Sequence, residues 1–359
     1  MAHSAKKAVI DLRSRVEVAL RDFLSDEAKY LHGIGDELTP AMSALTSFLL
    51  DSGKRLRPLF AAVGYFGAGG NDDDGVLRAV ASLELLQACA LIHDDLMDAS
   101  DTRRGKPSIH KQFEALHGDG GWHGSPEDFG RAASVLLGDL ALVWSSQMLH
   151  RSGIPHSVMS NVLRISDEMR VELMSGQYLD VYEQTRDTHD LARSLKIARY
   201  KSGKYTIERP LHFGAALSGA PLDSDVFTTY SAFGLPLGEA FQLRDDLLGV
   251  VGDPAATGKP AGDDLREGKH TALIAIAVER LSGSDKTTFS ELFGNEQLDS
   301  SGIEQLRSLI VTTGADQEIE QMIETLTSNA RAALDDGKIA PTALSLFEEL
   351  ATSATRRSV

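Results

Sequence analysis

The feature that most limits how this chain can fold is a long apolar segment at residues 76–98, VLRAVASLELLQACALIHDDLMD. Apolar residues fall on almost every side of a helix drawn through it, and acidic residues gather at its C-terminal end. A helix without a polar face has to be surrounded by protein. The segment therefore predicts a buried central helix.

Helical periodicity also dominates the rest of the chain, and no series of Val/Ile/Thr-rich strands is visible. Further helices are predicted at 131–150, 157–184, 191–209, 226–250, 271–282 and 303–334.

Polar, glycine-rich breaks separate these segments, and helices of similar character flank each break. We therefore expect residues 1–359 to form a single all-α domain with its motif-bearing core at about 40–275. The breaks lie at 67–75, 117–130, 252–270 and 283–302.

The cysteine count and the net charge limit the cellular compartment and the binding partners that can be expected. Cys89 is the one cysteine, so no intrachain disulfide is possible and a reducing compartment, the cytoplasm, is expected. The N-terminal residues show no signal peptide, and no run of about 18 apolar residues predicts a membrane span. The net charge of -16 argues against nucleic acid as the main partner.

An acidic motif closes the central apolar segment. Asp94 and Asp98 are four residues apart, so on a helix they share one face and repel each other. A divalent cation would remove this repulsion, and carboxylates that leave coordination sites for water and phosphate suit Mg²⁺. Taken alone, the motif is equally compatible with a solvated acidic helix end.

A second acidic motif, Asp245 and Asp246, ends the apolar stretch 232–250. The C-terminal end of a helix is electrostatically unfavourable for anions, so two such placements suggest a functional reason. Further carboxylates follow in the loop, at Asp253, Asp263 and Asp264.

Two basic motifs could bind phosphate groups. Lys54 and Arg57 are three residues apart and can converge on one phosphate, and Gly53 allows a close backbone approach. Arg103 and Arg104 are adjacent, so they point in different directions and could serve two anions. Surface charge at a helix start, or an exposed loop pair, would explain either motif alone.

Taken together, these motifs resemble the trans-type isoprenyl diphosphate synthases, the polyprenyl synthetase family, and most of all its bacterial geranylgeranyl diphosphate synthase-like members. The resemblance runs from about Gly53 to His270. The matching segments are GKRLRP, ELLQACALIHDDLMDASDTRRGKP, GDLAL, YKSGKY, FQLRDDLLG and GDPAATGKPAGDDLREGKHT.

The resemblance implies the isoprenoid synthase fold, a large antiparallel helical bundle around a deep central cavity, and a homodimer. It also implies a Mg²⁺-dependent trans-prenyltransferase that condenses isopentenyl diphosphate with allylic diphosphates, and three Mg²⁺ ions per active site are expected.

By the same resemblance, each motif residue receives a role. Isopentenyl diphosphate is expected to be bound by Lys54, Arg57, Gln87 and Arg104. The allylic diphosphate is expected to contact Arg103, Lys201, Ser202, Gln242, Lys259 and Lys269. The expected metal ligands are Asp94, Asp95, Asp98, Asp245 and Asp246. Catalysis is expected to depend on Asp94, Asp98, Asp245 and Lys201.

The second motif departs from the fullest family pattern at one position. An aspartate is expected four residues after Asp245, and Gly249 stands there instead. Asp263 is a possible substitute ligand.

Product length is expected to depend on the residues four and five before Asp94, which are Ala90 and Cys89. Bulky aromatic residues there give short products in the family. Two small residues favour geranylgeranyl diphosphate (C20) as the main product, with a farnesyl or a longer-chain synthase as the alternative.

Other classes of protein share part of this pattern. A class I terpene cyclase would need no second diphosphate site, which the two basic motifs supply. A non-catalytic subunit of a heteromeric synthase usually loses one acidic motif. A di-metal carboxylate bundle would need Glu-x-x-His motifs at paired positions within its helices. The two such tetrapeptides in the sequence, at 114–117 and 267–270, reach into the predicted breaks, so this class is remote. His93 is adjacent to the first motif and is expected to pack rather than to catalyse.

Overall fold

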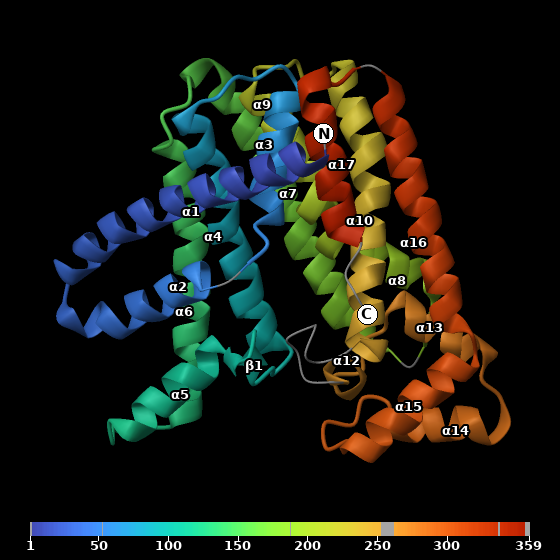
Figure 1. The fold of residues 1–359 in the computed structure, drawn as a ribbon. Helices are drawn as coiled ribbons and strands as arrows, with labels where there is room; N and C mark the ends of the chain where they lie inside the picture. Colours follow the sequence, from blue (N-terminus) through green and yellow to red (C-terminus); the bar gives the residue numbers. More distant parts are fainter. Residues whose placement is uncertain (1, 52, 187, 253–261, 337, 356–359) are drawn as a thin grey trace. The chain divides into compact units, whose positions relative to one another are not determined.

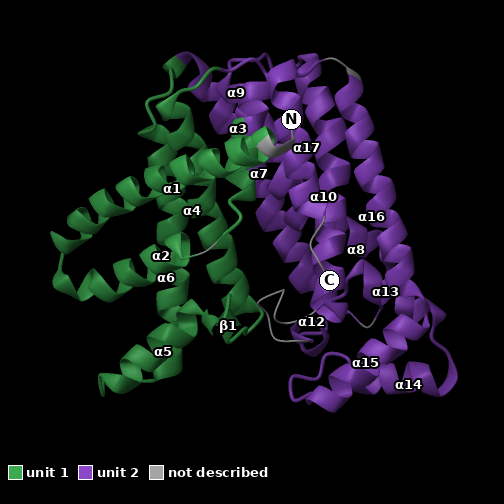
Figure 2. Ribbon diagram, viewed as in Figure 1, with its two compact units in different colours: residues 1, 3–62, 71–156 green, residues 2, 63–70, 157–359 purple. Residues whose placement is uncertain are grey.

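The computed structural model describes residues 2–51, 53–186, 188–252, 262–336 and 338–355 (Figure 1). The chain divides into two compact units, which are described separately (Figure 2). Unit 1 comprises residues 1, 3–62 and 71–156, and unit 2 comprises residues 2, 63–70 and 157–359.

Unit 1 is helical apart from one short hairpin. Its elements are α1 (Ala2–His32), η1 (Asp36–Leu38), α2 (Thr39–Leu50), the start of α3 (Leu56–Gly67), α4 (Asp74–Met97), β1 (Thr102–Arg103), β2 (Lys106–Pro107), α5 (Ile109–Asp119) and α6 (Pro126–His150). The two strands pair antiparallel and carry Arg103 and Lys106 opposite each other.

Helix α4 is the core helix of unit 1. It begins because the Asp73 carboxylate accepts hydrogen bonds from the backbone N–H groups of Gly75 and Val76, at 2.6 and 3.2 Å. Most of its residues are buried, as the continuous apolar pattern predicts. Helix α6 packs along it so closely that a Cβ on Gly138 would overlap the ring of His93.

Unit 2 contains the remaining helices. They are α7 (His156–Gln184), α8 (Leu191–Ile197), η2 (Ala198–Glu208), α9 (Arg209–Leu217), α10 (Asp225–Val251), α12 (Asp263–Arg266), α13 (Ala272–Arg280), α14 (Gly283–Leu292), α15 (Ser300–Thr312), α16 (Ala315–Ala332), η3 (Ala333–Asp336) and α17 (Pro341–Thr355).

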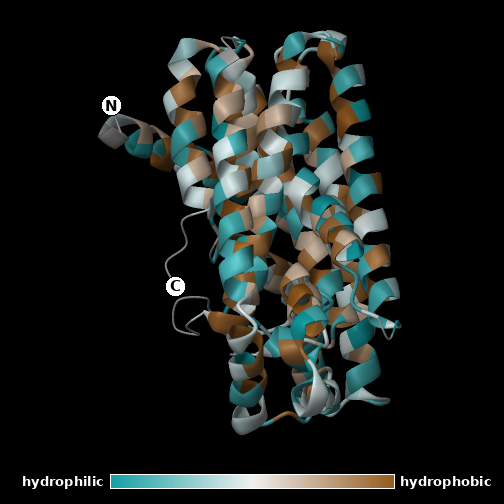
Figure 3. Ribbon diagram, turned by 90° about the vertical axis from the view of Figure 1, so that its right-hand side faces the viewer, coloured by the Kyte–Doolittle hydropathy of each residue, from teal (hydrophilic) through white to brown (hydrophobic). Residues whose placement is uncertain are grey.

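The core of unit 2 forms around α10, which packs against α16, α17 and η2. Its largest buried side chain is Tyr230, whose hydroxyl donates a 2.6 Å hydrogen bond to the carbonyl oxygen of Gly64. Figure 3 shows hydrophobic and hydrophilic residues alternating along the long helices, the pattern of amphipathic helices with one buried side.

Element η2 is a π-helix of 11 residues, and glycines allow the neighbouring helices to approach it closely. A Cβ on Gly176 of α7 would overlap the backbone of Lys201, and one on Gly238 of α10 would overlap the backbone of Gly203. π-helical segments are rare and occur frequently at functional sites. Residues 191–209, expected as one helix, are thus an α-helix continued by a π-helix.

The all-α prediction is confirmed, and one long helix was predicted wrongly. Residues 303–334 do not form a single helix, because the chain breaks at Gly314, which has a φ of 72°. Glycine adopts a positive φ without steric cost, so the chain can turn at this position. The apolar periodicity of the sequence nevertheless continues from one helix to the next and conceals the turn. The predicted break at 283–302 contains α14.

Two helices are long and apolar enough to cross a membrane by length and composition, although no span was expected from the sequence. In α4, 78% of the qualifying window is buried inside the protein, and in α6 the share is 44%. A buried core helix in water passes the same test. The two helices are therefore weak evidence for membrane insertion.

Candidate active site

The first acidic motif lies at the C-terminal end of α4. Asp94 is in the last turn of the helix, and Asp98 is its C-cap, with a backbone N–H that donates to the Asp94 carbonyl oxygen at 2.8 Å. The two residues are therefore one turn apart, as the spacing predicts. The side chain of Asp94 is 17% exposed. Both carboxylate oxygens of Asp98 are shielded from solvent.

The middle aspartate of this motif binds Arg103. Asp95 is fully buried and accepts hydrogen bonds from Nε and Nη2 of Arg103, the first at 2.7 Å. Burial raises the pKa of Asp95 to about 6, while Arg103 lowers it and the charges of Asp94 and Asp98 raise it further. The contact that the structure supports for Asp95 is thus with Arg103, and its role as a metal ligand stays a prediction.

Arg103 is held between the carboxylates. Besides its bonds to Asp95, its Nη2 atom lies 3.6 Å from Asp94 Oδ2. Arg104 follows in the left-handed region, with a φ of 55°, and donates through Nη1 to the Phe48 carbonyl oxygen at 3.3 Å. The adjacent arginines therefore point in different directions, as expected, and Arg103 forms ion pairs with Asp94 and Asp95 of the acidic motif.

The remaining residues assigned to isopentenyl diphosphate also lie in unit 1. Lys54 is exposed just before α3, and Arg57 is half-buried in the first turn of that helix. Gln87 is half-buried on α4, seven residues before Asp94. The structure places all three on elements of one unit, and their contact with a substrate stays a prediction.

The two residues expected to set product length differ in their surroundings. Cys89 is fully buried, and its Sγ atom lies 3.8 Å from Nδ1 of His93. Nε2 of His93 lies 3.2 Å from the carbonyl oxygen of Val135 on α6. Cys89 and His93 therefore face α6, and His93 is packed. Ala90 is half-buried and lies one turn before Asp94.

The second acidic motif lies in the last turns of α10. Nε2 of Gln242 donates to Oδ1 of Asp246 at 2.6 Å. Burial raises the pKa of Asp246 to about 8; the hydrogen bond from Gln242 lowers it, and the charges of Asp264, Asp245 and Asp180 raise it. Four carboxylates thus crowd one region of unit 2, which favours a bound cation.

Gly249 has a physical explanation. A Cβ at this position would overlap the carboxylate of Asp264, so that the Asp264 side chain takes the space of the missing aspartate. Asp263, the substitute ligand proposed from the sequence, forms an ion pair with Arg266 at 2.9 Å, and its role as a ligand stays a prediction. Lys269 Nζ lies 2.6 Å from Glu267 and 3.5 Å from Asp264.

The π-helix presents two of the predicted residues. Lys201 Nζ forms an ion pair with Oδ2 of Asp180 on α7 at 2.6 Å. Ser202 is buried, with 8% of its surface exposed. Lys259, the remaining residue assigned to the allylic diphosphate, lies outside the described residues.

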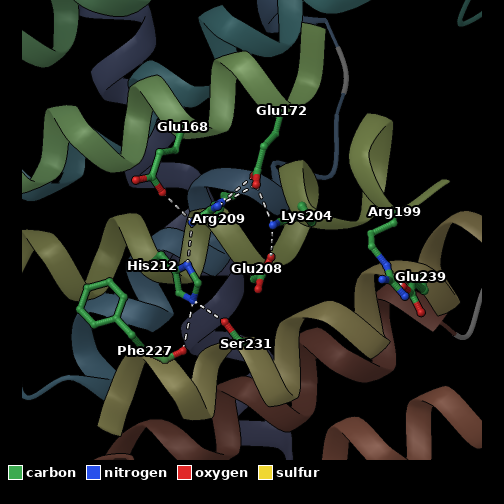
Figure 4. A network of polar contacts seen from close by, with 10 residues as sticks. All are labelled: Glu168, Glu172, Arg199, Lys204, Glu208, Arg209, His212, Phe227, Ser231 and Glu239. Carbon is green, nitrogen blue, oxygen red and sulfur yellow. Dashed lines mark hydrogen bonds and ion pairs between the residues drawn. The ribbon is translucent and has the colours of Figure 1, made fainter. Parts of the chain in front are cut away.

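A polar network holds the π-helix in place (Figure 4). Arg209, which begins α9, forms two parallel 2.7 Å hydrogen bonds with Glu172 of α7 and a 3.0 Å ion pair with Glu168. Lys204 of the π-helix forms a 2.7 Å ion pair with the same Glu172. Bidentate, charge-assisted bonds of this kind fix orientation.

The network continues to α10 through His212. Its Nε2 atom lies 3.2 Å from the Phe227 carbonyl oxygen and 3.1 Å from the Ser231 hydroxyl. Burial lowers the pKa of His212 to about 4, so the ring is neutral at pH 7. Contacts of Lys204, Arg209 and His212 therefore tie α7, α9 and α10 together (Figure 4). Lys201 and Ser202 belong to the same π-helix as Lys204.

The donor set suits a hard divalent cation. Each motif offers carboxylate oxygens, the ligands that Mg²⁺ prefers, and crowding of negative charge is evident at Asp95 and Asp246. Within the described ranges, no group of three His, Cys, Asp or Glu side chains is arranged to hold a metal ion.

Comparison with known proteins identifies the family. A sequence model of the polyprenyl synthetase family matches residues 39–310. Geranylfarnesyl diphosphate synthase of Aeropyrum pernix is 32% identical over 287 residues, 79% of this chain and 83% of that protein. Farnesyl diphosphate synthase of Mycobacterium tuberculosis is 34% identical over 260 residues, 69% of this chain and 66% of that protein.

The fold agrees with a solved structure from the same group. Geranylgeranyl pyrophosphate synthase of Corynebacterium glutamicum, solved with isoprenyl diphosphate and magnesium, is 40% identical, with a TM-score of 0.92 over 96% of this chain and 98% of that one. The fold is thus the all-α isoprenoid synthase fold. The chain belongs to the polyprenyl synthetase family and is a prenyltransferase.

Two residues near the predicted site were not singled out from the sequence. Asp180 lies within a helix 21 residues before its partner Lys201, and a single acidic residue on an amphipathic helix gives no signal. Asp264 was noted only as one of several loop carboxylates. Its pairing with Gly249 depends on how the chain returns to α10, which local spacing does not show.

We expect Glu172→Gln to destabilise the protein by about 2–3 kcal/mol at pH 7, because Lys204 and Arg209 lose the charge that compensates their partial burial. In the wild-type protein, burial alone would raise the pKa of Glu172. The hydrogen bonds from Arg209 and Lys204 outweigh this effect and hold that pKa below its ordinary value of 4.5. A lowered folded-state pKa gives stability above about pH 4.5, which is lost as the pH falls further.

Urea denaturation at several pH values measures this effect, and the difference between wild type and variant should shrink below about pH 4.5. Glu324→Gln, at an exposed position on α16 of the same unit, is the control and should change stability by less than about 0.5 kcal/mol. A difference that stays constant down to pH 3 would contradict the ion-pair explanation.

Proposed function

We propose that this protein joins isopentenyl diphosphate to an allylic diphosphate of C5 to C15, lengthens the chain in the all-trans form and releases diphosphate, with geranylgeranyl diphosphate as the main product. The observation that carries the proposal is the pair of carboxylate groups at the ends of α4 and α10, each with cationic side chains on the same unit. The similarity to the magnesium-bound Corynebacterium glutamicum enzyme supports it.

The chemistry divides into ionisation, condensation and elimination. The C–O bond of the allylic diphosphate breaks, and the electron pair leaves with the diphosphate. The double bond of isopentenyl diphosphate then attacks the allylic cation and forms the new C–C bond. A proton is lost to the departing diphosphate, since His93 is packed against α6 and is not positioned as a base.

The chain's own residues bind and orient the two substrates in this scheme. Arg103, Lys201, Ser202, Gln242, Lys259 and Lys269 contact the allylic diphosphate. Lys54, Arg57, Gln87 and Arg104 hold isopentenyl diphosphate. Asp94, Asp98 and Asp245, with Asp95 and Asp246 beside them, would hold Mg²⁺, and three ions are expected from the family resemblance. The bound metal would supply positive charge that makes diphosphate a good leaving group.

Incubating the purified protein with isopentenyl diphosphate, Mg²⁺ and each of the C5, C10 and C15 allylic diphosphates tests the function, with products resolved by chromatography. Asp94→Asn should lower kcat at least about a hundredfold, because the leaving group loses charge stabilisation. Lys54→Ala should raise the KM for isopentenyl diphosphate about tenfold or more, the value of a charge-assisted hydrogen bond.

The rival classes give other outcomes in this assay. A terpene cyclase would consume the allylic diphosphate without isopentenyl diphosphate, and a non-catalytic subunit would show no turnover when purified alone. Either result would refute the proposed function.

The relatives are named for three different products, so they do not decide the product length of this enzyme. The proposed C20 product therefore depends on the small side chains of Ala90 and Cys89. Ala90→Phe should shift the product towards farnesyl diphosphate, since Ala90 is half-buried one turn before Asp94. Cys89→Phe should shorten the product less and lower the melting temperature more, because Cys89 is fully buried beside His93. Unchanged product profiles in both variants would refute this placement.

We also propose a cytoplasmic homodimer in which α7 pairs with its copy. An exposed apolar stripe follows α7 at the 3-4-3 spacing of a helix–helix seam. It consists of Val171 at 65% exposure, Met174 at 41%, Tyr178 at 70% and Val181 at 37%. Apolar residues exposed in one continuous stripe mark an interaction surface.

Tyr178→Asp should convert the dimer to monomer in sedimentation equilibrium, because a buried unpaired carboxylate opposes association. Tyr30→Asp is the matched control, since Tyr30 on α1 is 68% exposed and lies outside the stripe. A wild-type protein that sediments as a monomer at micromolar concentration would exclude the dimer.

A further inference from the structure

The middle residue of the first basic motif is buried, although its neighbours are not. Arg55 is 2% exposed, whereas Lys54 before it is exposed and Arg57 after it is half-buried. Neither the family resemblance nor the proposed reaction gives Arg55 or its carboxylate partner a task. A buried guanidinium in a loop of cationic residues requires a structural explanation.

The Arg55 guanidinium joins three helices of unit 1. Its Nη1 atom donates to Oε2 of Glu84 on α4 at 2.8 Å, and its Nη2 atom donates to the Leu49 carbonyl oxygen in the last turn of α2 at 2.5 Å. Its Nε atom lies 3.5 Å from Oε1 of Glu17 on α1. The rigid planar fork of arginine suits such a set of separate acceptors.

The backbone of the motif is shaped around this side chain. Arg55 has a φ of 53°, in the left-handed region that side chains other than glycine rarely adopt. Gly53 has a φ of 148°, and a Cβ there would lie 2.9 Å from Nη1 of Arg55. The Arg55 carbonyl oxygen accepts the Leu59 N–H at 3.0 Å, so Arg55 also starts α3. Its position therefore sets the direction of Lys54 and Arg57.

Glu84 is an unusual residue for a core helix. It is 5% exposed and lies within α4, three residues before Gln87 and ten before Asp94. A buried carboxylate is destabilising unless it is paired, and an apolar residue of similar volume would pack there at less cost. Glu84 therefore gives α4 a specific attachment to the loop that holds the basic motif.

Arg104 binds the same end of α2 as Arg55. Arg104 also has a left-handed backbone and donates to the Phe48 carbonyl oxygen, next to the Leu49 carbonyl that Arg55 uses. Burial lowers the pKa of Arg104, and the charge of Glu84 acts in the opposite direction. The Phe48 and Leu49 carbonyls at the C-terminal end of α2 thus accept from both arginines.

We propose that Glu84 and Arg55 are positioning residues that hold Lys54, Arg57 and Arg104 in the geometry needed to bind isopentenyl diphosphate. The proposal rests on the proposed function, because it assumes that those three cations bind this substrate. The Arg55 guanidinium itself is turned inward onto Glu84, Leu49 and Glu17, so the proposal gives it no substrate contact.

Glu84→Gln in the full-length protein tests the proposal through steady-state kinetics with both substrates varied. The KM for isopentenyl diphosphate should rise about tenfold or more, since a small misplacement of binding groups has large effects. The KM for the allylic diphosphate and the kcat should stay within about twofold. Arg55→Lys, which keeps the charge and loses the planar fork, should give the same split.

Glu27→Gln is the matched control. Glu27 is also a buried glutamate of unit 1, 4% exposed, and it is bound by Gln147 at 2.5 Å and by Arg151 at 3.0 Å. Its loss should lower the melting temperature as Glu84→Gln does and leave both KM values unchanged. Equal changes of KM in the two variants would show a purely structural role for Glu84 and overturn the inference.

Two further outcomes separate the inference from the proposed function. If Lys54→Ala and Arg57→Ala raise the KM for isopentenyl diphosphate and Glu84→Gln does not, the binding site stands and the inference is wrong. If none of them changes that KM, the assignment of the binding site itself is wrong. Should Glu84→Gln fail to fold, Glu84→Asp and Arg55→Lys provide the same readout.

Discussion

The structure places carboxylates at the C-terminal ends of buried apolar helices, where both the helix dipole and the loss of solvation make a negative charge unfavourable. Helix α4 is buried along most of its length and ends in Asp94, Asp95 and Asp98, and α10 is buried and ends in Asp245 and Asp246. The C-terminal end of a helix carries partial negative charge, and burial removes the solvation of ions. The surrounding residues relieve this strain only in part.

The relief takes a different form in each unit. In unit 1, Arg103 turns back from the short hairpin, binds Asp95 and lies 3.6 Å from Asp94. In unit 2, the neighbours of Asp246 are Gln242 and three further carboxylates. Carboxylates lie close together in both units, which fits an active site whose full charge balance includes bound metal and diphosphate.

The sequence predicted best what depends on local pattern. The continuous apolar run predicted α4, and the i, i+4 spacing of Asp94 and Asp98 predicted their shared turn. It failed where long-range packing decides. The helix expected at 303–334 breaks at Gly314, because a periodic pattern does not record a positive φ. The close packing around the π-helix at 198–208 depends on glycines of α7 and α10 that lie far away in sequence.

Arg55 has a consequence for engineering of this motif. A designer who grafts GKRLRP onto another helical scaffold would transfer the cations without the acceptors that shape their backbone, since Glu84 and the carbonyl end of α2 come from other parts of the chain. Removing one member of a buried ion pair is far more damaging than replacing both. Residues 55 and 84 should therefore covary among homologous enzymes, and the smallest transplantable unit is the loop together with α1, α2 and α4.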